Sequence, residues 1–194
     1  LSQVKGSNTV EFLYPFTPSN IFEVNIQSAL ILDDLGLAEY FWEDNTLNRL
    51  FDFSDQLAQK GYRGNDGIKL SNDFFLFGSM HKQSPEDNPG AVWCLKNKKI
   101  TKVAKNFIPN LFVNVGEHIL IADSFKKIIY KHSAITGHMQ DVWLDLSDSI
   151  GEPDGGCLSK DGYIYIANWG AAEILKYGID GKYYMAKRID SLQP

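Results

Sequence analysis

Three short polar side chains recur at a nearly constant spacing, and together they could bind a metal ion. Asn65, Asn110 and Asp154 are separated by 45 and 44 residues. Each lies 12 or 13 positions before the end of an apolar, strand-like run, and these runs span 74–78, 118–122 and 163–167. Carboxylate and amide oxygens are the ligands that hard divalent cations prefer. If the fold gathers the three residues, the sequence predicts an oxygen-rich metal site.

The spacing itself predicts the elements that would gather them. A period of about 45 residues with several strands per unit is typical of a β-propeller, in which the same phase of successive blades faces one central channel. The run that ends at Asp33 lies 45 residues before Gly78, so a further repeat fits the same frame. The sequence therefore predicts one continuous all-β domain over 1–194, with about four blade repeats.

Strand and turn signals fill the rest of the chain. The aromatic content of 13% and the 16 glycines favour β structure. Polar turns between apolar runs predict several hairpins, whose strands are 21–32, 37–42 with 47–53, 91–95 with 100–103, 126–131, 173–177 and 183–186. Residues 83–90 read as an exposed loop. No long amphipathic helix is expected, and 144–150 would form at most one short turn.

Composition excludes several functions. The net charge is −5, and the densest basic run, Lys96 to Lys99, reads as a solvated turn, so nucleic acid is not an expected partner. No apolar stretch is long enough to span a bilayer, and the N-terminal residues lack the pattern of a signal peptide. Cys94 and Cys157 could form one disulfide, but two reduced thiols are the prediction. These features favour a cytoplasmic protein without a membrane partner.

The local motifs are ambiguous when each is taken alone. Asn65-Asp66-Gly67 and Pro153-Asp154-Gly155 are ordinary turn sequences, and Asn110 by itself carries little information. Arg63 adds a guanidinium beside the first motif, and paired N–H donors of this kind bind polyols or oxyanions. The common register of the motifs, more than their composition, indicates a site.

The histidines and tryptophans give weaker signals. His81 follows a predicted central strand and could act as an acid or base near the channel mouth, whereas the other three histidines read as structural or exposed. The indoles at Trp93, Trp143 and Trp169 are expected to pack between strands.

These motifs, taken in order, resemble the senescence-marker-protein/gluconolactonase/luciferin-regenerating family, which includes regucalcin. The resemblance runs from about Val10 to Lys182 and rests on linked signatures: 63–67 with 77–80, Asn110 with 121–124, and 153–156 with 167–170. It implies a β-propeller of the six-bladed type, one divalent cation in the central channel, and lactone hydrolysis as the commonest activity.

Site residues follow from the resemblance position by position. Asn110 and Asp154 match metal ligands. Arg63, Asn65 and Glu86 match substrate-contacting positions, and Asn65 reaches the metal through water or substrate. The family's early ligand Glu has no counterpart, since Glu11 lacks the expected neighbours. Leu111 stands where the family usually has Gly.

Family segments at both ends of the repeat array also have no counterpart in this sequence, which predicts an incomplete propeller. Such a ring would leave strand edges open for pairing with a partner. Loss of one charged ligand would weaken the cation site.

Three functions follow as hypotheses. In the first, the chain is a metal-dependent lactonase in which Asp154 holds the cation and acts as general base, and Arg63, Asn65 and Glu86 orient a lactone or sugar-acid substrate. Calcium or zinc is the expected cation, with magnesium and manganese as alternatives. In the second, it is a non-catalytic calcium- or small-molecule-binding propeller. In the third, it is a truncated propeller that self-associates through open blade edges.

Overall fold

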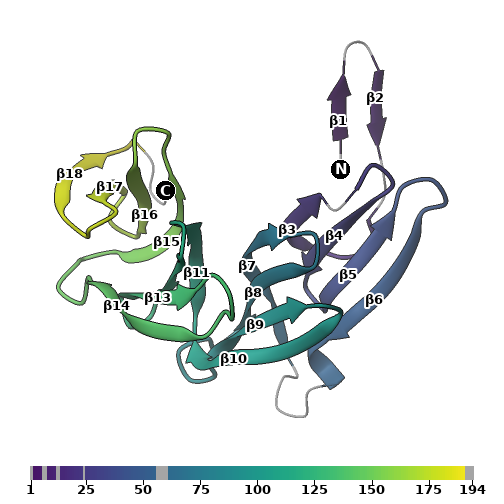
Figure 1. Cartoon of the computed structure of the whole chain (residues 1–194), viewed down its shortest axis with the longest axis horizontal. Coiled ribbons are helices and arrows are strands. Elements are labelled where there is room, and N and C mark those ends of the chain that lie inside the picture. The colour runs from purple at the N-terminus through teal and green to yellow at the C-terminus, as the bar shows by residue number, and fades with distance from the viewer. Residues whose placement is uncertain (1, 6–7, 12–13, 24, 56–60, 191–194) are drawn as a thin grey trace.

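The computed structural model describes residues 2–5, 8–11, 14–23, 25–55 and 61–190, and in them almost all regular structure is β. Sixteen strands form four four-stranded antiparallel sheets, each a simple meander of consecutive strands. A separate hairpin, β1 (Ser2–Lys5) with β2 (Asn8–Glu11), stands apart from these sheets (Figure 1). The only helical element among the described residues is the 3₁₀ turn η1 (Phe53–Asp55). The predicted all-β class is confirmed.

The four sheets follow one another along the chain. The first sheet holds β3 (Pro18–Glu23), β4 (Ser28–Asp33), β5 (Gly36–Phe41) and β6 (Thr46–Asp52). The second sheet holds β7 (Tyr62–Ser71), β8 (Phe74–His81), β9 (Gly90–Lys96) and β10 (Lys99–Phe107). The third sheet holds β11 (Pro109–Asn114), β12 (His118–Asp123), β13 (Ile128–Ser133) and β14 (Met139–Asp145). The fourth sheet holds β15 (Glu152–Leu158), β16 (Tyr163–Trp169), β17 (Glu173–Gly178) and β18 (Tyr183–Arg188).

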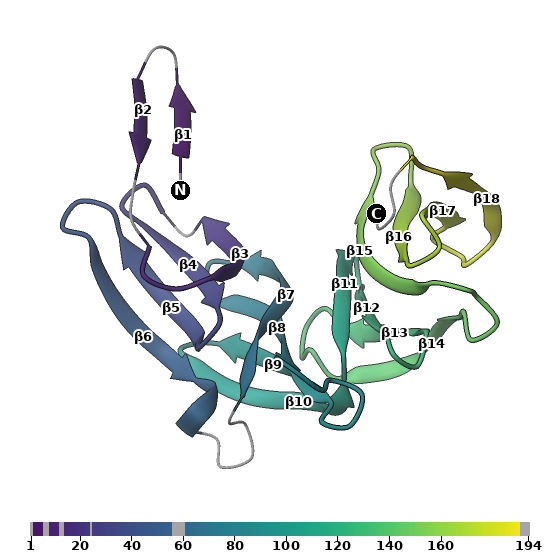
Figure 2. The same cartoon turned by 180° about the vertical axis from the view of Figure 1, so that it is seen from behind.

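The sheets are arranged in sequence order along an arc, which both views show (Figures 1 and 2). The first strand of each sheet meets the first strand of the next, so β3 contacts β7, β7 contacts β11, and β11 contacts β15. Each of these strands begins one repeat, as the spacing of the polar residues predicts. The repeat therefore brings one phase of the sequence onto neighbouring strands.

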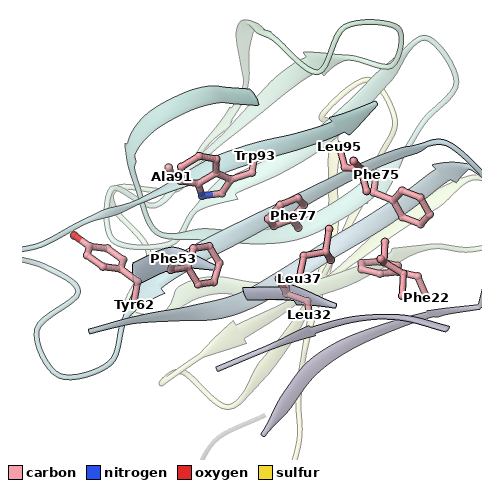
Figure 3. Close-up of a cluster of buried hydrophobic side chains, with 11 residues drawn as sticks. Phe22, Leu32, Leu37, Phe53, Tyr62, Phe75, Phe77, Ala91, Trp93 and Leu95 are labelled. Carbon is pink, nitrogen blue, oxygen red and sulfur yellow. The ribbon is translucent and has the colours of Figure 1, made fainter. Parts of the chain in front are cut away.

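Apolar side chains from facing sheets form the core. Between the first and second sheets, Phe22, Leu32 and Leu37 pack against Phe77 and Trp93 (Figure 3). Phe74 and Leu76, on the opposite face of β8, pack instead against the third sheet through Phe112, Ile119 and Ile121. Successive side chains of a strand point to opposite faces. A strand buried on both faces must therefore be continuously apolar, which explains the run at 74–77.

A ladder irregularity interrupts the first strand of every sheet. The register of β7 shifts between Gly64 and Gly67, that of β11 between Asn110 and Val113, and that of β15 between Pro153 and Gly156. β3 has its own shift between Pro18 and Asn20. A β-bulge bends the strand and re-aims the side chains beside it. The irregularities on β7, β11 and β15 lie at predicted site residues.

Most local expectations are confirmed, and one is wrong. Leu144 lies within β14, and the segment that follows forms one short turn, as expected, closed by the Ser149 amide donating to the Leu146 carbonyl. Trp169, which the sequence predicts to pack between strands, is instead 42% exposed at the end of β16. Cys94 and Cys157 are both free thiols, as predicted. No helix in the described ranges has the length and hydropathy needed to cross a membrane.

Candidate functional site

The predicted site residues lie on three neighbouring strands. Arg63 and Asn65 are on β7, Asn110 is on β11, and Asp154 is on β15. Asn65 Nδ2 donates to Asn110 Oδ1 at 2.8 Å and to the Pro109 carbonyl at 2.9 Å. Two residues of the 45-residue repeat are therefore bonded directly across the boundary between the second and third sheets.

Hydrogen bonds extend this contact in both directions. Arg63 Nη1 donates to Asn65 Oδ1 at 2.9 Å and to the Gly64 carbonyl at 2.8 Å. Asn110 Nδ2 donates to Ser124 Oγ at 3.0 Å, and the Ser124 hydroxyl donates to the Pro153 carbonyl at 2.6 Å. We call this chain, Arg63–Asn65–Asn110–Ser124–Pro153, the site relay. It crosses three sheets and ends one residue before Asp154.

Asp154 is half-buried and shares its surroundings with Arg63. Burial raises the pKa of the Asp154 carboxyl, and the charge of Arg63 acts in the opposite direction. Burial likewise lowers the pKa of the Arg63 guanidinium, which Asp154 offsets in part. Within the described residues, no hydrogen bond or ion pair engages the Asp154 carboxylate. It is therefore available to a proton, a cation or a water molecule.

Glu152, two residues before Asp154, is a second carboxylate whose pKa is raised. Burial raises the pKa of Glu152, Lys127 lowers it, and both Glu86 and Asp154 raise it. Glu86 is exposed on the loop between β8 and β9, yet its charge reaches β15 in the fourth sheet. Across the described part of the chain, no hydrogen bond or ion pair joins Glu86 to Arg63, Asn65 or Asp154. Glu86 thus lies at the rim of the site.

Asp66 and Asn20 are neighbours of the site that the sequence analysis did not select. Asn20 Nδ2 donates to Asp66 Oδ1 at 3.1 Å and to the Gly67 carbonyl at 2.9 Å. Burial raises the pKa of Asp66, and Asp154 adds to this in the same direction, while the bonds from Gly67 and Asn20 oppose it. Asn20 lies 45 residues before Asn65, so the repeat spacing held the signal that would have found it.

Leu111, the residue after Asn110, has a φ of 56°. This left-handed conformation is unfavourable for a side chain branched beyond Cβ and is usual for glycine. Leu111 is nevertheless fully buried. Leu111 thus adopts the backbone conformation usual for glycine and places an apolar side chain beside the site. A strained backbone conformation of this kind persists because the surrounding residues pack around it.

A second set of recurring polar residues stabilises the fold and lies outside the site. Asp33 and Asp123 end the second strand of their sheets, Asn168 is the penultimate residue of β16, and all three are buried. Asp123 accepts from Lys126 Nζ at 2.7 Å and from the Ile108 amide at 3.3 Å. Because such partners satisfy these side chains, they are structural.

Among the described residues, no hydrogen bond joins His81 to the site relay. Its Nδ1 accepts from the Ser84 amide at 3.1 Å, and its ring packs edge-on against Tyr62. The ring therefore anchors the start of the loop that carries Glu86, which makes a structural role the better account. His132 is also structural and buried, with Nδ1 bonded to the Gly137 carbonyl.

The site offers oxygen ligands for a cation but few of them. No group of three or more His, Cys, Asp or Glu side chains in the described ranges could hold a metal ion. The predicted ligands are instead one amide oxygen, Asn110 Oδ1, and one carboxylate, Asp154. Burial is the main cause that raises the pKa values of Asp154, Asp66 and Glu152, and a bound cation would favour their charged forms. The donor set fits a hard cation that takes its remaining ligands from water or substrate.

Comparison with known proteins identifies the family. The model of the SMP-30/gluconolactonase/LRE-like region matches residues 3–190. A protein of Rhizobium meliloti (strain 1021), provisionally named a sugar lactone lactonase, is 28% identical over 188 residues, which are 93% of this chain and 63% of the relative.

Solved structures agree with this match at the level of the fold. A calcium-binding protein, regucalcin, from Agrobacterium tumefaciens strain C58 superposes with a TM-score of 0.82 and 22% identity, over 96% of this chain and 65% of that one. A luciferin-regenerating enzyme superposes with a TM-score of 0.77 and 18% identity, over 91% and 64% of the two chains. The chain thus spans somewhat less than two thirds of the length of these relatives.

Proposed function

The chain belongs to the SMP-30/gluconolactonase/LRE-like family, and from that premise we propose that it hydrolyses lactones at the site relay. One observation carries the proposal. The relay fixes the donor groups of Arg63 and the amides of Asn65 and Asn110 on β7 and β11, and β11 adjoins β15, which carries the half-buried Asp154 carboxylate that no described residue bonds. Fixed donors and a free base near one another are the requirements of ester hydrolysis.

Substrate binding is assigned to Arg63, Asn65 and Glu86. Arg63 uses only Nη1 in its two hydrogen bonds, which leaves N–H groups on Nε and Nη2 for the hydroxyl or carbonyl oxygens of a sugar lactone. Asn65 holds the guanidinium in this orientation. Glu86, at the rim, can accept hydrogen bonds from substrate hydroxyl groups. These contacts support a polar sugar lactone rather than an apolar ester.

Asp154 is assigned as the general base. Burial makes its carboxylate a stronger base than a solvated one, because a raised pKa means tighter proton binding. Asp154 takes a proton from the attacking water as the water oxygen bonds to the lactone carbonyl carbon. The ring C–O bond then breaks, and the leaving ring oxygen takes up the proton to become a hydroxyl group. A divalent cation held by Asn110 and Asp154, calcium or zinc in first place and magnesium or manganese otherwise, would polarise the lactone carbonyl.

We also propose that the four sheets are consecutive blades of a β-propeller of the six-bladed type. Residues 1–194 would form a single domain, and β3, β7, β11 and β15 would line its channel. The arc of sheets and the match to regucalcin support this assignment.

Hydrolysis of a panel of sugar and aliphatic lactones tests the proposal. Chelator-treated protein would be measured with a pH indicator, with and without each of the four cations. We expect cation-restored turnover that Asp154→Ala abolishes. Asp161→Ala, at an exposed turn beyond the site, serves as the matched carboxylate control and should retain turnover. Absence of turnover in folded protein with every cation would contradict the proposal.

A specific observation favours a second candidate, non-catalytic calcium binding. Asp154 is the single charged side chain in the proposed ligand set, and the pKa of neighbouring Glu152 and Asp66 is raised as well. A calcium titration that shows binding lost in Asp154→Ala, in a sample without lactone turnover, would select this candidate.

A third candidate is self-association. Tyr183, Tyr184 and Met185 are exposed on β18, the outermost strand of the fourth sheet. An unpaired edge strand with apolar side chains can pair with another chain. A solution mass above 21.9 kDa that Met185→Lys reduces would support this candidate.

A further inference from the structure

We propose that Ser124 is a positioning residue, which sets the orientation of the Asn110 side-chain amide and so decides which Asn110 atom faces Asn65 and the site. Ser124 follows β12 and is buried. Its consequence for cation binding and turnover rests on the proposed function. The orientation itself rests only on the hydrogen-bond geometry.

The orientation follows from what each group can donate. A serine hydroxyl carries one donor hydrogen and two acceptor lone pairs. The Pro153 carbonyl can only accept, so the 2.6 Å contact must use the hydroxyl hydrogen. Only lone pairs then remain for Asn110, whose atom at 3.0 Å must be the donor Nδ2. Asn110 Oδ1 is consequently directed to Asn65.

The hydrogen bonds at the Arg63 end of the relay require the same orientation of the Asn110 amide. Arg63 is a donor without acceptor capacity, so its partner on Asn65 must be Oδ1. Asn65 Nδ2 therefore faces Asn110, which must present Oδ1 to it. If the Asn110 amide rotated by half a turn, two NH₂ groups would face each other and Oδ1 would meet a hydroxyl without a free hydrogen.

The main chain holds Ser124 in place for this role. Its amide donates to the Ile108 carbonyl at 3.0 Å, and its carbonyl accepts from the Lys127 amide at 3.1 Å. The hydroxyl thus stands at a fixed point between the third and fourth sheets. Without it, the Asn110 amide would lose the only partner that the relay provides for Nδ2.

The competing account is that Ser124 only ties two sheets together. Ser79 provides a matched control for that account, because it is another buried serine with a fully used hydroxyl. Ser79 Oγ accepts from the Ala91 amide at 3.1 Å and from Trp93 Nε1 at 3.0 Å, and these partners belong to the second sheet. Ser79 makes no hydrogen bond to the relay.

The test follows the Asn110 side-chain amide by NMR, with its resonances assigned by their loss in Asn110→Asp. In Ser124→Ala we expect the Asn110 NH₂ protons to shift and to exchange with solvent about tenfold faster or more. Calcium affinity, measured with the metal alone, should fall about 10- to 100-fold, as on loss of other groups that orient a metal ligand. Ser79→Ala should lower thermal stability without either effect.

The outcomes separate the two proposals. Unchanged Asn110 resonances and exchange in Ser124→Ala would overturn the role of Ser124, whatever the activity of the protein. Failure of the parent protein to bind calcium or to hydrolyse lactones would overturn the proposed function, and the amide measurement would still decide the role of Ser124. If Ser124→Ala does not fold, Ser124→Cys preserves the shape and replaces the hydroxyl with a weakly bonding thiol, and the same shifts are expected in it.

Discussion

Leu111 occupies the space that a side chain on Gly156 would need. A Cβ atom built on Gly156 would lie 2.6 Å from Leu111 Cδ1 and 2.6 Å from the Tyr165 carbonyl oxygen. The two residues are on β11 and β15, so the contact fixes how closely these strands approach beside Asn110 and Asp154. A buried leucine in a left-handed backbone conformation is therefore paired with a glycine on the next sheet.

We expect Gly156→Ala to destabilise the fold by about 1–3 kcal/mol through overpacking. The contact with the Tyr165 carbonyl cannot be relieved by a side-chain rotation, so Leu111→Ala in the same chain should not rescue it fully. Urea unfolding of Gly156→Ala and of the double variant Gly156→Ala with Leu111→Ala measures both effects. Gly155→Ala is the control, since a Cβ there meets no atom within 4 Å. Equal stability of Gly156→Ala and Gly155→Ala would contradict the close packing at Gly156.

The left-handed backbone at Leu111 predicts an inverted order of substitutions. Leu111→Ala and Leu111→Gly both lose the buried side chain, at a cost of about 2–5 kcal/mol. Gly should nevertheless be more stable than Ala by about 1 kcal/mol, since it adopts a positive φ without steric cost. At Leu120, which is equally buried and lacks a positive φ, the order should be the usual one, with Ala more stable. Equilibrium unfolding of the four variants checks this, and the same order at both sites would refute it.

Asn65→Leu should weaken both the site and the fold. The substitution keeps the approximate shape but leaves Asn110 Oδ1 and the Pro109 carbonyl without the Asn65 donor, and Arg63 keeps only the Gly64 carbonyl as acceptor. Each unsatisfied buried group costs about 1–3 kcal/mol. We expect a fall in the free energy of unfolding together with a loss of lactone turnover. Asn48→Leu, at an exposed position of β6, should change stability by less than about 0.5 kcal/mol.

The buried His132 side chain should lower the free energy of unfolding in mild acid. Burial lowers its pKa below the ordinary 6.5, while the bond to the Gly137 carbonyl opposes this. Nε2 is buried, and no described residue offers it a hydrogen-bond partner, so a proton there would be uncompensated. Below pH 6.5 the unfolded chain binds a proton that the folded chain does not, and stability therefore falls as the pH decreases through this window. The fall can reach about 1.4 kcal/mol per pH unit for one proton.

Urea unfolding at several pH values between 7.5 and 5 measures this effect. His132→Gln cannot titrate but can still donate to the Gly137 carbonyl, so it should lose the His132 share of the pH dependence. An unchanged slope in His132→Gln would show that other groups cause it.

The sequence determined the strand pattern and the phase of the site. Apolar runs such as 74–77 require burial on both faces, and the spacing of Asn65, Asn110 and Asp154 fixes one phase of a repeat. Hairpins such as β9 with β10 follow from local turn chemistry, with Asn97 and Lys98 both at positive φ. These features are local or periodic, so a single chain records them.

Only the tertiary structure decided how the site is connected. The bond from Asn65 to Asn110 joins residues 45 positions apart, and the bond from Ser124 to Pro153 joins residues 29 apart. Such contacts depend on how closely neighbouring sheets pack and on where each strand is bulged, and neither is encoded in a local pattern. The same reason explains why the Asp123 carboxylate has hydrogen-bond partners while none of the described residues bonds that of Asp154. Both are aspartates in phase with the repeat, and only their packed surroundings separate a structural residue from a candidate base.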